Sequence, residues 1–215
     1  MELREPNIEE YEKLDIFKGD LLSRQEVEDA AQLMGIEIWE DHKDEEPLCI
    51  YVANGGEYIA TEIQKTFSKL NFNPEFTSIS VERTTQESGF RQPLITKDIP
   101  EHIDLTGRTV IIFEDIIDEG ETIEMLRQEL LKRGAARVEV AVLLERQSQK
   151  PEGYVPPKYR GFRLAGDAFV FGSGLDDGRL PDADGGRYVS GVLMNYPFGK
   201  VPGVDFNHRP DSGVQ

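Results

Sequence analysis

Basic residues and cysteine are scarce in this chain of 215 residues. It has 24 Lys and Arg against 41 Asp and Glu, a formal net charge of −17, and so acidic a surface repels nucleic acids and anionic membranes. The single cysteine excludes an internal disulfide framework, and three scattered histidines exclude a His-rich metal site. No apolar run approaches the roughly 20 residues that cross a bilayer, and no charged-then-apolar leader opens the chain. We therefore expect a cytoplasmic protein that binds neither nucleic acid nor membrane, with a local exception wherever it binds an anion.

Strand and helix patterns alternate between about residues 48 and 144. The apolar content of 38% is low but sufficient for a core, and the length suits one domain. Continuous apolar runs predict strands that are covered on both faces. The expected strands are Leu48–Ala53, Phe76–Val81, Thr109–Phe113 and Val138–Leu144. This order favours an α/β fold with a mostly parallel, twisted sheet flanked by helices.

Three helices are expected around these strands. Ser23 and Glu26 form a capping-box pattern, an apolar stripe runs from Val27 to Met34, and Gly35 is the predicted terminator. The other two helices are marked by Ile59, Ile63, Phe67 and Leu70, and by Ile123, Leu126 and Leu130 with Gly134 closing the helix. The polar stretches 41–46 and 83–92 show no period, so we expect a solvated loop and a long mobile loop, respectively.

The two ends of the chain differ from its middle. Residues 1–18 show no steady periodicity and are expected to form an N-terminal arm, and residues 200–215 a loose tail. The domain would then span residues 19–199. Short apolar pieces separated by Gly, Pro and Asp predict a small irregular subdomain, mainly from 146–199 together with the N-terminal segment.

The most informative strand end is the acidic segment 114–122, which reads Glu-Asp-Ile-Ile-Asp-Glu-Gly-Glu-Thr. Ligands of open α/β sheets bind outside the carboxyl ends of the strands. A helix that begins here presents unpaired N–H groups and the positive end of its dipole, which favours an anion. Gly120 lets the backbone approach that anion closely, and the Thr122 hydroxyl can donate a further hydrogen bond.

A simpler interpretation is that Asp118, Glu119 and Glu121 only cap the helix, as acidic residues often do. That interpretation accounts well for Glu119 and Glu121. It does not explain why Glu114 and Asp115 stand at the end of a buried apolar strand.

This segment resembles the phosphoribosyl-pyrophosphate (PRPP) signature of the type I phosphoribosyltransferases, and its Glu-Asp-Ile-Ile-Asp form is closest to their hypoxanthine(-guanine) branch. Order and spacing are similar over roughly residues 20–195. Further matching segments are the Asn54-Gly55-Gly56 turn for the pyrophosphate loop, Ser80 and Ser88-Gly89 for the lid loop, and Phe169-Val170-Phe171-Gly172 with Leu175-Asp176 for the purine-binding segment. The resemblance implies the type I phosphoribosyltransferase fold, with the small subdomain as its hood.

The resemblance also implies an enzyme of purine salvage that transfers phosphoribosyl from PRPP to hypoxanthine and/or guanine, giving IMP or GMP and pyrophosphate. Its transition state is similar to an oxocarbenium ion, so negative charge placed around the developing cation lowers the barrier. By resemblance, Glu114 and Asp115 hold the ribose hydroxyls, and Asp118 is the general acid/base at the purine N7. The 5-phosphate would meet the backbone N–H groups of Glu119, Gly120, Glu121 and Thr122.

Base and metal binding are implied in the same way. Phe169 would stack on the purine, with the Val170 backbone and Leu175 beside it, and Arg146 stands where the family has a lysine that contacts the exocyclic oxygen. Arginine is always charged and presents a planar fork, so it donates with a different geometry. Mg²⁺ would be held by PRPP and by Asp176, a hard oxygen ligand. Core packing for Phe169 and surface solvation for Arg146 are the simpler alternatives, and a homodimer or homotetramer is expected by resemblance only.

The departures from the family pattern concern pyrophosphate. The loop reads Ala53-Asn54-Gly55 instead of Leu-Lys-Gly, and Glu119 replaces a small hydroxyl residue. Ser80 is followed by valine instead of tyrosine, and the basic residue expected after Asp176 is displaced, with Arg179 and Arg187 as candidates. These changes motivate two alternatives, a PRPP- or nucleotide-binding regulator without turnover and, because of Arg146, a transferase for xanthine or another base. Cys49, His42, His102 and His208 are assigned no chemistry.

Overall fold

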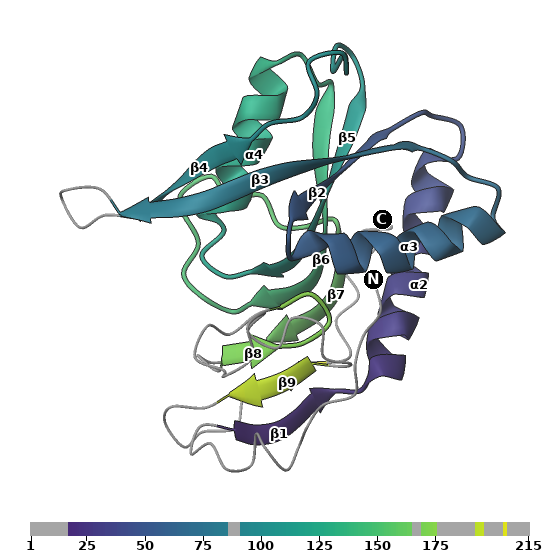
Figure 1. Cartoon of the computed structure of the whole chain (residues 1–215). Helices are drawn as coiled ribbons and strands as arrows, with labels where there is room; N and C mark the ends of the chain where they lie inside the picture. The colour runs from purple at the N-terminus through teal and green to yellow at the C-terminus, as the bar shows by residue number, and fades with distance from the viewer. Residues whose placement is uncertain (1–16, 86–90, 165–168, 176–191, 196–203, 206–215) are drawn as a thin grey trace, which may run out of the picture.

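The computed structural model of the chain describes residues 17–85, 91–164, 169–175, 192–195 and 204–205 (Figure 1). Its elements in chain order are β1 (Phe17–Leu22), α2 (Arg24–His42), β2 (Leu48–Ala53), α3 (Gly56–Lys69), β3 (Glu75–Thr85), β4 (Arg91–Lys97), β5 (Thr109–Ile117), α4 (Glu121–Lys132), β6 (Arg137–Arg146), β7 (Tyr159–Leu164), β8 (Phe169–Phe171), β9 (Val192–Asn195) and β10 (Val204–Asp205). Within these ranges, none of the helices combines the length and the apolar character needed to cross a membrane.

Among the described strands, seven form the main sheet in the order β10-β7-β6-β5-β2-β3-β4. The strands from β7 to β3 are parallel, and β10 and β4 pair antiparallel at the two edges. The predicted α/β fold with a mostly parallel sheet is therefore confirmed. The carboxyl ends of β2, β3 and β5 consequently meet at one edge of the sheet.

Helices cover both faces of this sheet, because successive side chains of a strand point in opposite directions. In β5, Ile111 and Phe113 pack with buried residues of α2 and α3, whereas Val110 and Ile112 pack with those of α4. Figure 1 accordingly shows α4 on a different side of the sheet from α3. The continuous apolar runs of the sequence thus supply two cores at once.

A smaller, antiparallel sheet has the order β1-β9-β8 in the described part of the chain. It joins the N-terminal segment 17–22 to residues 169–171 and 192–195. Residues 162–164 belong to β7 of the main sheet and not to this smaller sheet. Residues 1–16 and 206–215, which include most of the predicted arm and tail, lie outside the described residues.

Helix α2 begins as the sequence predicts but ends later. Ser23 accepts from the backbone N–H of Glu26 at 3.3 Å, and the Glu26 carboxylate accepts from the N–H of Ser23 at 2.8 Å. The prediction that Gly35 ends this helix is wrong, because α2 continues to His42. A Cβ at position 35 would lie 2.9 Å from the Cβ of Thr66, so the absence of a side chain allows α2 and α3 to pack closely.

The prediction of a long mobile loop over residues 83–92 is wrong at both ends of that range. β3 extends to Thr85, β4 begins at Arg91, and the two strands pair antiparallel. Figure 1 shows this hairpin projecting beyond the body of the protein. The successive residues Glu82 and Arg83 are both exposed, so both strand faces meet solvent and no apolar alternation marks the strand in the sequence.

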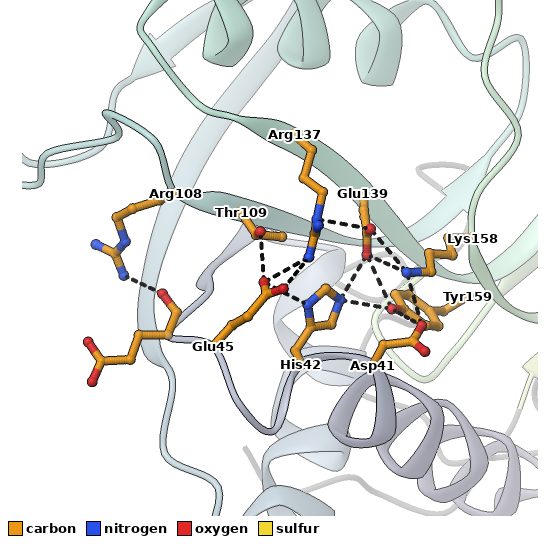
Figure 2. A network of polar contacts seen from close by, with 10 residues as sticks. Asp41, His42, Glu45, Arg108, Thr109, Arg137, Glu139, Lys158 and Tyr159 are labelled. Atoms are coloured by element: carbon orange, nitrogen blue, oxygen red, sulfur yellow. Dashed lines mark hydrogen bonds and ion pairs between the residues drawn. The ribbon is translucent and has the colours of Figure 1, made fainter.

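A polar network connects the end of α2 to the first residues of β5, β6 and β7, at the edge opposite the carboxyl ends of the strands (Figure 2). His42 is fully buried, and its Nε2 lies 2.9 Å from the Glu139 carboxylate and 3.0 Å from the Tyr159 hydroxyl. Its Nδ1 lies 3.3 Å from the carboxylate of Glu45. The prediction of a solvated loop over residues 41–46 is therefore wrong for His42. This residue is buried, and both of its ring nitrogens have polar partners.

Charged residues complete this network around Glu139 and Glu45. Lys158 donates to Glu139 at 3.0 Å, and Arg137 donates to Glu45 at 2.6 Å. Burial on its own would raise the pKa of Glu139, but its hydrogen bonds with His42 and Lys158 outweigh burial and lower the pKa to about 2. The charged form of Glu139 is thus stabilised in the folded chain.

We predict that Glu139→Gln lowers the free energy of unfolding at pH 7 by about 1–3 kcal/mol, because it removes charge-assisted hydrogen bonds from a part-buried site. The folded pKa lies below the ordinary value of 4.5, so this stabilisation is present above pH 4.5 and is lost as the pH falls toward 2. Urea unfolding between pH 7 and pH 3 should show a shallower loss of stability in the variant than in the original chain.

The matched control is Glu101→Gln, since Glu101 is exposed. It should leave both the stability at pH 7 and its acid dependence unchanged. Equal pH profiles for Glu139→Gln and the original chain would contradict a stabilising role for the charged form of Glu139.

Candidate active site

A cavity of about 390 Å³ opens where β2, β3 and β5 end and α4 begins. This is the edge at which ligands of open parallel sheets bind. Its walls come from three segments that are far apart in the sequence. The lining residues are Val52, Ala53, Asn54, Gly55, Val81, Arg83, Glu114, Asp115, Ile116, Ile117, Asp118, Gly120, Thr122 and Ile123. Seven of the residues singled out in the sequence are thereby brought together: Asn54, Gly55, Glu114, Asp115, Asp118, Gly120 and Thr122.

The turn between β2 and α3 lies directly against the end of β5. A Cβ at Gly55 would overlap the Asp115 carboxylate, and one at Gly56 would overlap the carbonyl oxygen of Phe113. The peptide bond between Ala53 and Asn54 is cis. Only glycines allow this turn to lie so close to the strand end, and Gly55 lines the cavity together with Asp115.

The two carboxylates at the end of β5 are held by neighbouring backbone groups. Glu114 is buried, and its Oε1 accepts from the N–H of Asp115 at 3.1 Å. The Asp115 Oδ1 accepts from the N–H of Ile116 at 2.7 Å. Each carboxylate thus has an orientation fixed by the strand end while it still lines the cavity.

The turn before α4 has the geometry of an anion site. Gly120 has φ +86°, and no side chain caps the helix that follows, so the first N–H groups of α4 are not occupied by a capping side chain. A Cβ at position 120 would lie 2.8 Å from the ring of Tyr154. A left-handed conformation and a crowded position both favour glycine here.

The two additional acids of this turn do not line the cavity. The Glu119 carboxylate is more than half exposed and lies 3.4 Å from the guanidinium of Arg83. Glu121 instead lines a separate depression with Glu124 and Gln128 of α4. Neither of these two acidic side chains therefore lies between the cavity and the backbone of the turn.

Beyond Asp118, a cluster of basic groups backs the turn. The Arg146 Nε lies 3.2 Å from the Asp118 Oδ1, and Arg146 is buried at the end of β6. The Lys150 ammonium donates to the backbone carbonyl of Asp118 and, at 2.9 Å, to that of Arg146. The pKa of Lys150 is lowered by burial, although the charges of Glu145 and Asp118 oppose this shift.

Other residues chosen from the sequence do not line the cavity. Arg146, Val170 and Leu175 are buried but are not among the described residues that line the cavity, and Ser80 in β3 does not line it either. Only the backbone of Phe169 is described, in β8. The remaining candidates lie outside the described residues: Ser88, Gly89, Asp176, Arg179 and Arg187.

No role was predicted for Lys150 or Tyr154 from the sequence. Both belong to the irregular segment between β6 and β7, where no period or motif marks a residue. The only signal in the sequence is a lysine four residues after Arg146, and this signal does not distinguish Lys150 from a solvated surface cation.

Across the residues that the structure describes, no group of three His, Cys, Asp or Glu side chains is arranged to hold a metal ion. The cavity does present the adjacent carboxylates of Glu114 and Asp115, and carboxylate oxygen is the ligand type that Mg²⁺ prefers.

Comparison with known proteins agrees with this geometry. The sequence profile of the phosphoribosyl transferase domain matches residues 19–177. The hypoxanthine-guanine phosphoribosyltransferase of Streptococcus pneumoniae is 32% identical over 164 residues, which cover 74% of this chain and 86% of that protein. The corresponding protein of Bacillus subtilis is 30% identical over 167 residues, with 76% and 87% covered.

Solved structures give the same fold. The hypoxanthine phosphoribosyltransferase of Trypanosoma cruzi in complex with its product IMP has a TM-score of 0.72 at 21% identity, and the match covers 85% of this chain and 96% of that one. The enzyme of Staphylococcus aureus has a TM-score of 0.73 at 20% identity, with 85% and 94% covered. The expected type I phosphoribosyltransferase fold and its hypoxanthine(-guanine) branch are confirmed: the chain belongs to the phosphoribosyl transferase domain family.

Proposed function

We propose that this phosphoribosyltransferase transfers the 5-phosphoribosyl group of PRPP to hypoxanthine and/or guanine, giving IMP or GMP and pyrophosphate in purine salvage. The observation that carries this proposal is that the Glu114-Asp115 pair and the uncapped start of α4 come together in one cavity. The bacterial relatives named hypoxanthine-guanine phosphoribosyltransferase, at 32% and 30% identity, support the choice of base.

Each part of the cavity suits one part of the reaction. A bond forms between the purine nitrogen and C1 of the ribose while the bond from C1 to the pyrophosphate oxygen breaks, and positive charge develops on the sugar. Glu114 and Asp115 would accept hydrogen bonds from the ribose hydroxyls and stabilise that charge. Asp118 would exchange the proton at the purine N7. The N–H groups of the turn 119–122 would bind the 5-phosphate.

We also propose that Mg²⁺ binds together with PRPP. The two adjacent carboxylates of the cavity fit a hard cation but do not form a complete set of ligands, so oxygens of PRPP would supply the others, with Asp176 as a further candidate. The bound ion would neutralise the charge of the leaving pyrophosphate. Arg179 and Arg187 are the candidate cations for the same group.

The base would lie on the side of Asp118 and Arg146, next to Phe169, Val170 and Leu175. The contact of Arg146 with the Asp118 carboxylate supports this placement, since both residues would then face the same edge of the purine. It also keeps xanthine as a second candidate base, because a guanidinium fork can donate to more than one exocyclic oxygen. A relative from Tritrichomonas foetus that is 27% identical over 163 residues is named hypoxanthine-guanine-xanthine phosphoribosyltransferase.

A cytoplasmic location and a homodimeric or homotetrameric assembly remain predictions from family membership. Light scattering during size-exclusion chromatography would measure the assembly directly.

The purified chain should release pyrophosphate from PRPP and Mg²⁺ with hypoxanthine or guanine, and competition between bases in the same assay should rank xanthine below them. Asp118→Asn should lower kcat about 10²- to 10⁴-fold, because it removes a general acid/base while keeping the size of the side chain. Binding of IMP, measured by calorimetry, should persist in this variant. The matched control is Asp44→Asn, since Asp44 is exposed, and it should leave kcat unchanged.

Absence of pyrophosphate release with every purine would defeat the proposal. Nucleotide binding without turnover, unaffected by Asp118→Asn, would favour the regulatory alternative instead.

Gly55→Ala should lower kcat/KM for PRPP at least about tenfold, because its Cβ would overlap the Asp115 carboxylate and move it away from the ribose. Initial rates at varied PRPP concentration measure this effect. Gly107→Ala is the control: Gly107 has φ +71° and open space at its Cβ position, so alanine there should cost stability without changing kcat/KM. A Gly55→Ala enzyme with unchanged kcat/KM would show that the contact does not shape the site.

A further inference from the structure

The backbone carbonyl of Asp118 is held from behind by two side chains. The Ser148 hydroxyl donates to it at 2.6 Å, and the Lys150 ammonium donates to it as well. The same ammonium donates to the carbonyl of Arg146 at 2.9 Å and to the Ser148 oxygen at 3.2 Å. Lys150 thereby connects the turn before α4 to the end of β6.

The orientation of this carbonyl determines the orientation of the next N–H group. In a trans peptide the C=O of one residue and the N–H of the following residue point in opposite directions across a rigid plane. The bonds from Ser148 and Lys150 therefore also fix the direction of the Glu119 N–H, away from the 148–150 segment. That N–H is the first of the turn that leads into α4.

Tyr154 supports the same turn at the next residue. Its ring lies against Gly120, where a Cβ would be only 2.8 Å away, and its hydroxyl donates to Glu145 at 3.0 Å. The Lys150 ammonium lies 5.4 Å from the centre of this ring, a distance at which a cation is attracted to an aromatic face. Turn, lysine and ring thus form one packed unit.

A lysine suits this position because the turn itself is acidic. Asp118 and Glu119 would otherwise repel a phosphate group bound to their backbone. The exposed pairing of Arg83 with Glu119 is screened by solvent, whereas Lys150 is half-buried and donates to the backbone of the turn, so its charge is screened less. A cation placed there offsets the local negative charge and polarises the Asp118 peptide.

We propose that Lys150 is a positioning residue for recognition of the 5-phosphate: with Ser148, it orients the Asp118–Glu119 peptide so that the Glu119 N–H faces the phosphate of PRPP or of the nucleotide. This inference rests on the proposed function, because it assigns the 5-phosphate to the turn 118–122. It adds that phosphate recognition also requires residues outside that turn, in the segment between β6 and β7.

The test compares ligands with and without the 5-phosphate. Lys150→Met retains most of the side-chain length but removes the charge and the donors. Calorimetry should show that its affinity for IMP and for ribose 5-phosphate falls about tenfold, while its affinity for inosine is unchanged. Lys150→Arg should recover most of the loss, because a guanidinium can still donate to both carbonyls. The matched control is Lys132→Met on α4, where the lysine is exposed, and it should bind all three ligands as the original chain does.

Equal losses for inosine and IMP would overturn the inference, since they would indicate a general structural role. Unchanged IMP affinity in Lys150→Met would overturn it as well. Thermal unfolding of each variant verifies folding. If Lys150→Met does not fold, Ser148→Ala is the second variant, because it removes one of the two hydrogen bonds to the Asp118 carbonyl. It should lower the affinity for IMP about threefold and leave the affinity for inosine unchanged. An unchanged affinity for IMP would count against the inference.

The proposed function can fail separately. If the original chain binds ribose 5-phosphate but releases no pyrophosphate with any purine, the enzyme proposal fails, and the Lys150 comparison is still decided by binding. If the original chain shows turnover and Lys150→Met changes the affinities for IMP and inosine equally, or changes neither, only the positioning role fails. If ribose 5-phosphate does not bind at all, both fail together.

Discussion

The contact between the Gly55-Gly56 turn and the end of β5 is the constraint on which the rest of the site depends. β2 and β5 are neighbouring parallel strands with Tyr51 paired to Phe113, so the residues that follow each strand must share the same small space. Only a turn without side chains leaves room there for the carboxylate of Asp115. The order of strands in the sheet therefore requires glycine in this turn. The turn then positions the acidic groups that line the cavity.

An acidic protein that binds a highly charged anion must separate its carboxylates from the anion. In this chain the separation is geometric. The Glu119 side chain pairs with Arg83 at an exposed position, and Glu121 lines a different depression. The backbone of the turn remains as the surface that faces the cavity, and Lys150 supplies positive charge from behind it. A net charge of −17 is thus compatible with phosphate binding, because short-range dipoles and nearby cations outweigh distant, screened charges.

The sequence predicted the parallel sheet and the motif at the end of β5, because both follow from local patterns: apolar runs for buried strands, and acidic residues followed by glycine at a helix start. It failed where a feature depends on a partner distant in the chain. Gly35 could be recognised as an internal contact only with Thr66 of α3 in place. His42 showed no pattern because both partners of its Nε2 come from β6 and β7. Lys150 lies in a segment without any period, so its role becomes visible only through the Asp118 carbonyl that it contacts.

The two edges of the parallel sheet satisfy their polar groups differently, and this difference separates stability from chemistry. At the amino ends of the strands, His42, Glu139 and Lys158 satisfy one another, so that no partner from outside is required. At the carboxyl ends, Glu114 and Asp115 accept hydrogen bonds from the adjacent backbone, and these bonds fix the orientation of two carboxylates that line the cavity. A carboxylate that is held by its own strand but still faces a cavity is prepared for a ligand, because binding then requires little further ordering. The sheet is therefore stabilised by a polar network at one edge, while the other edge holds oriented carboxylates at the cavity that phosphoribosyl transfer would use.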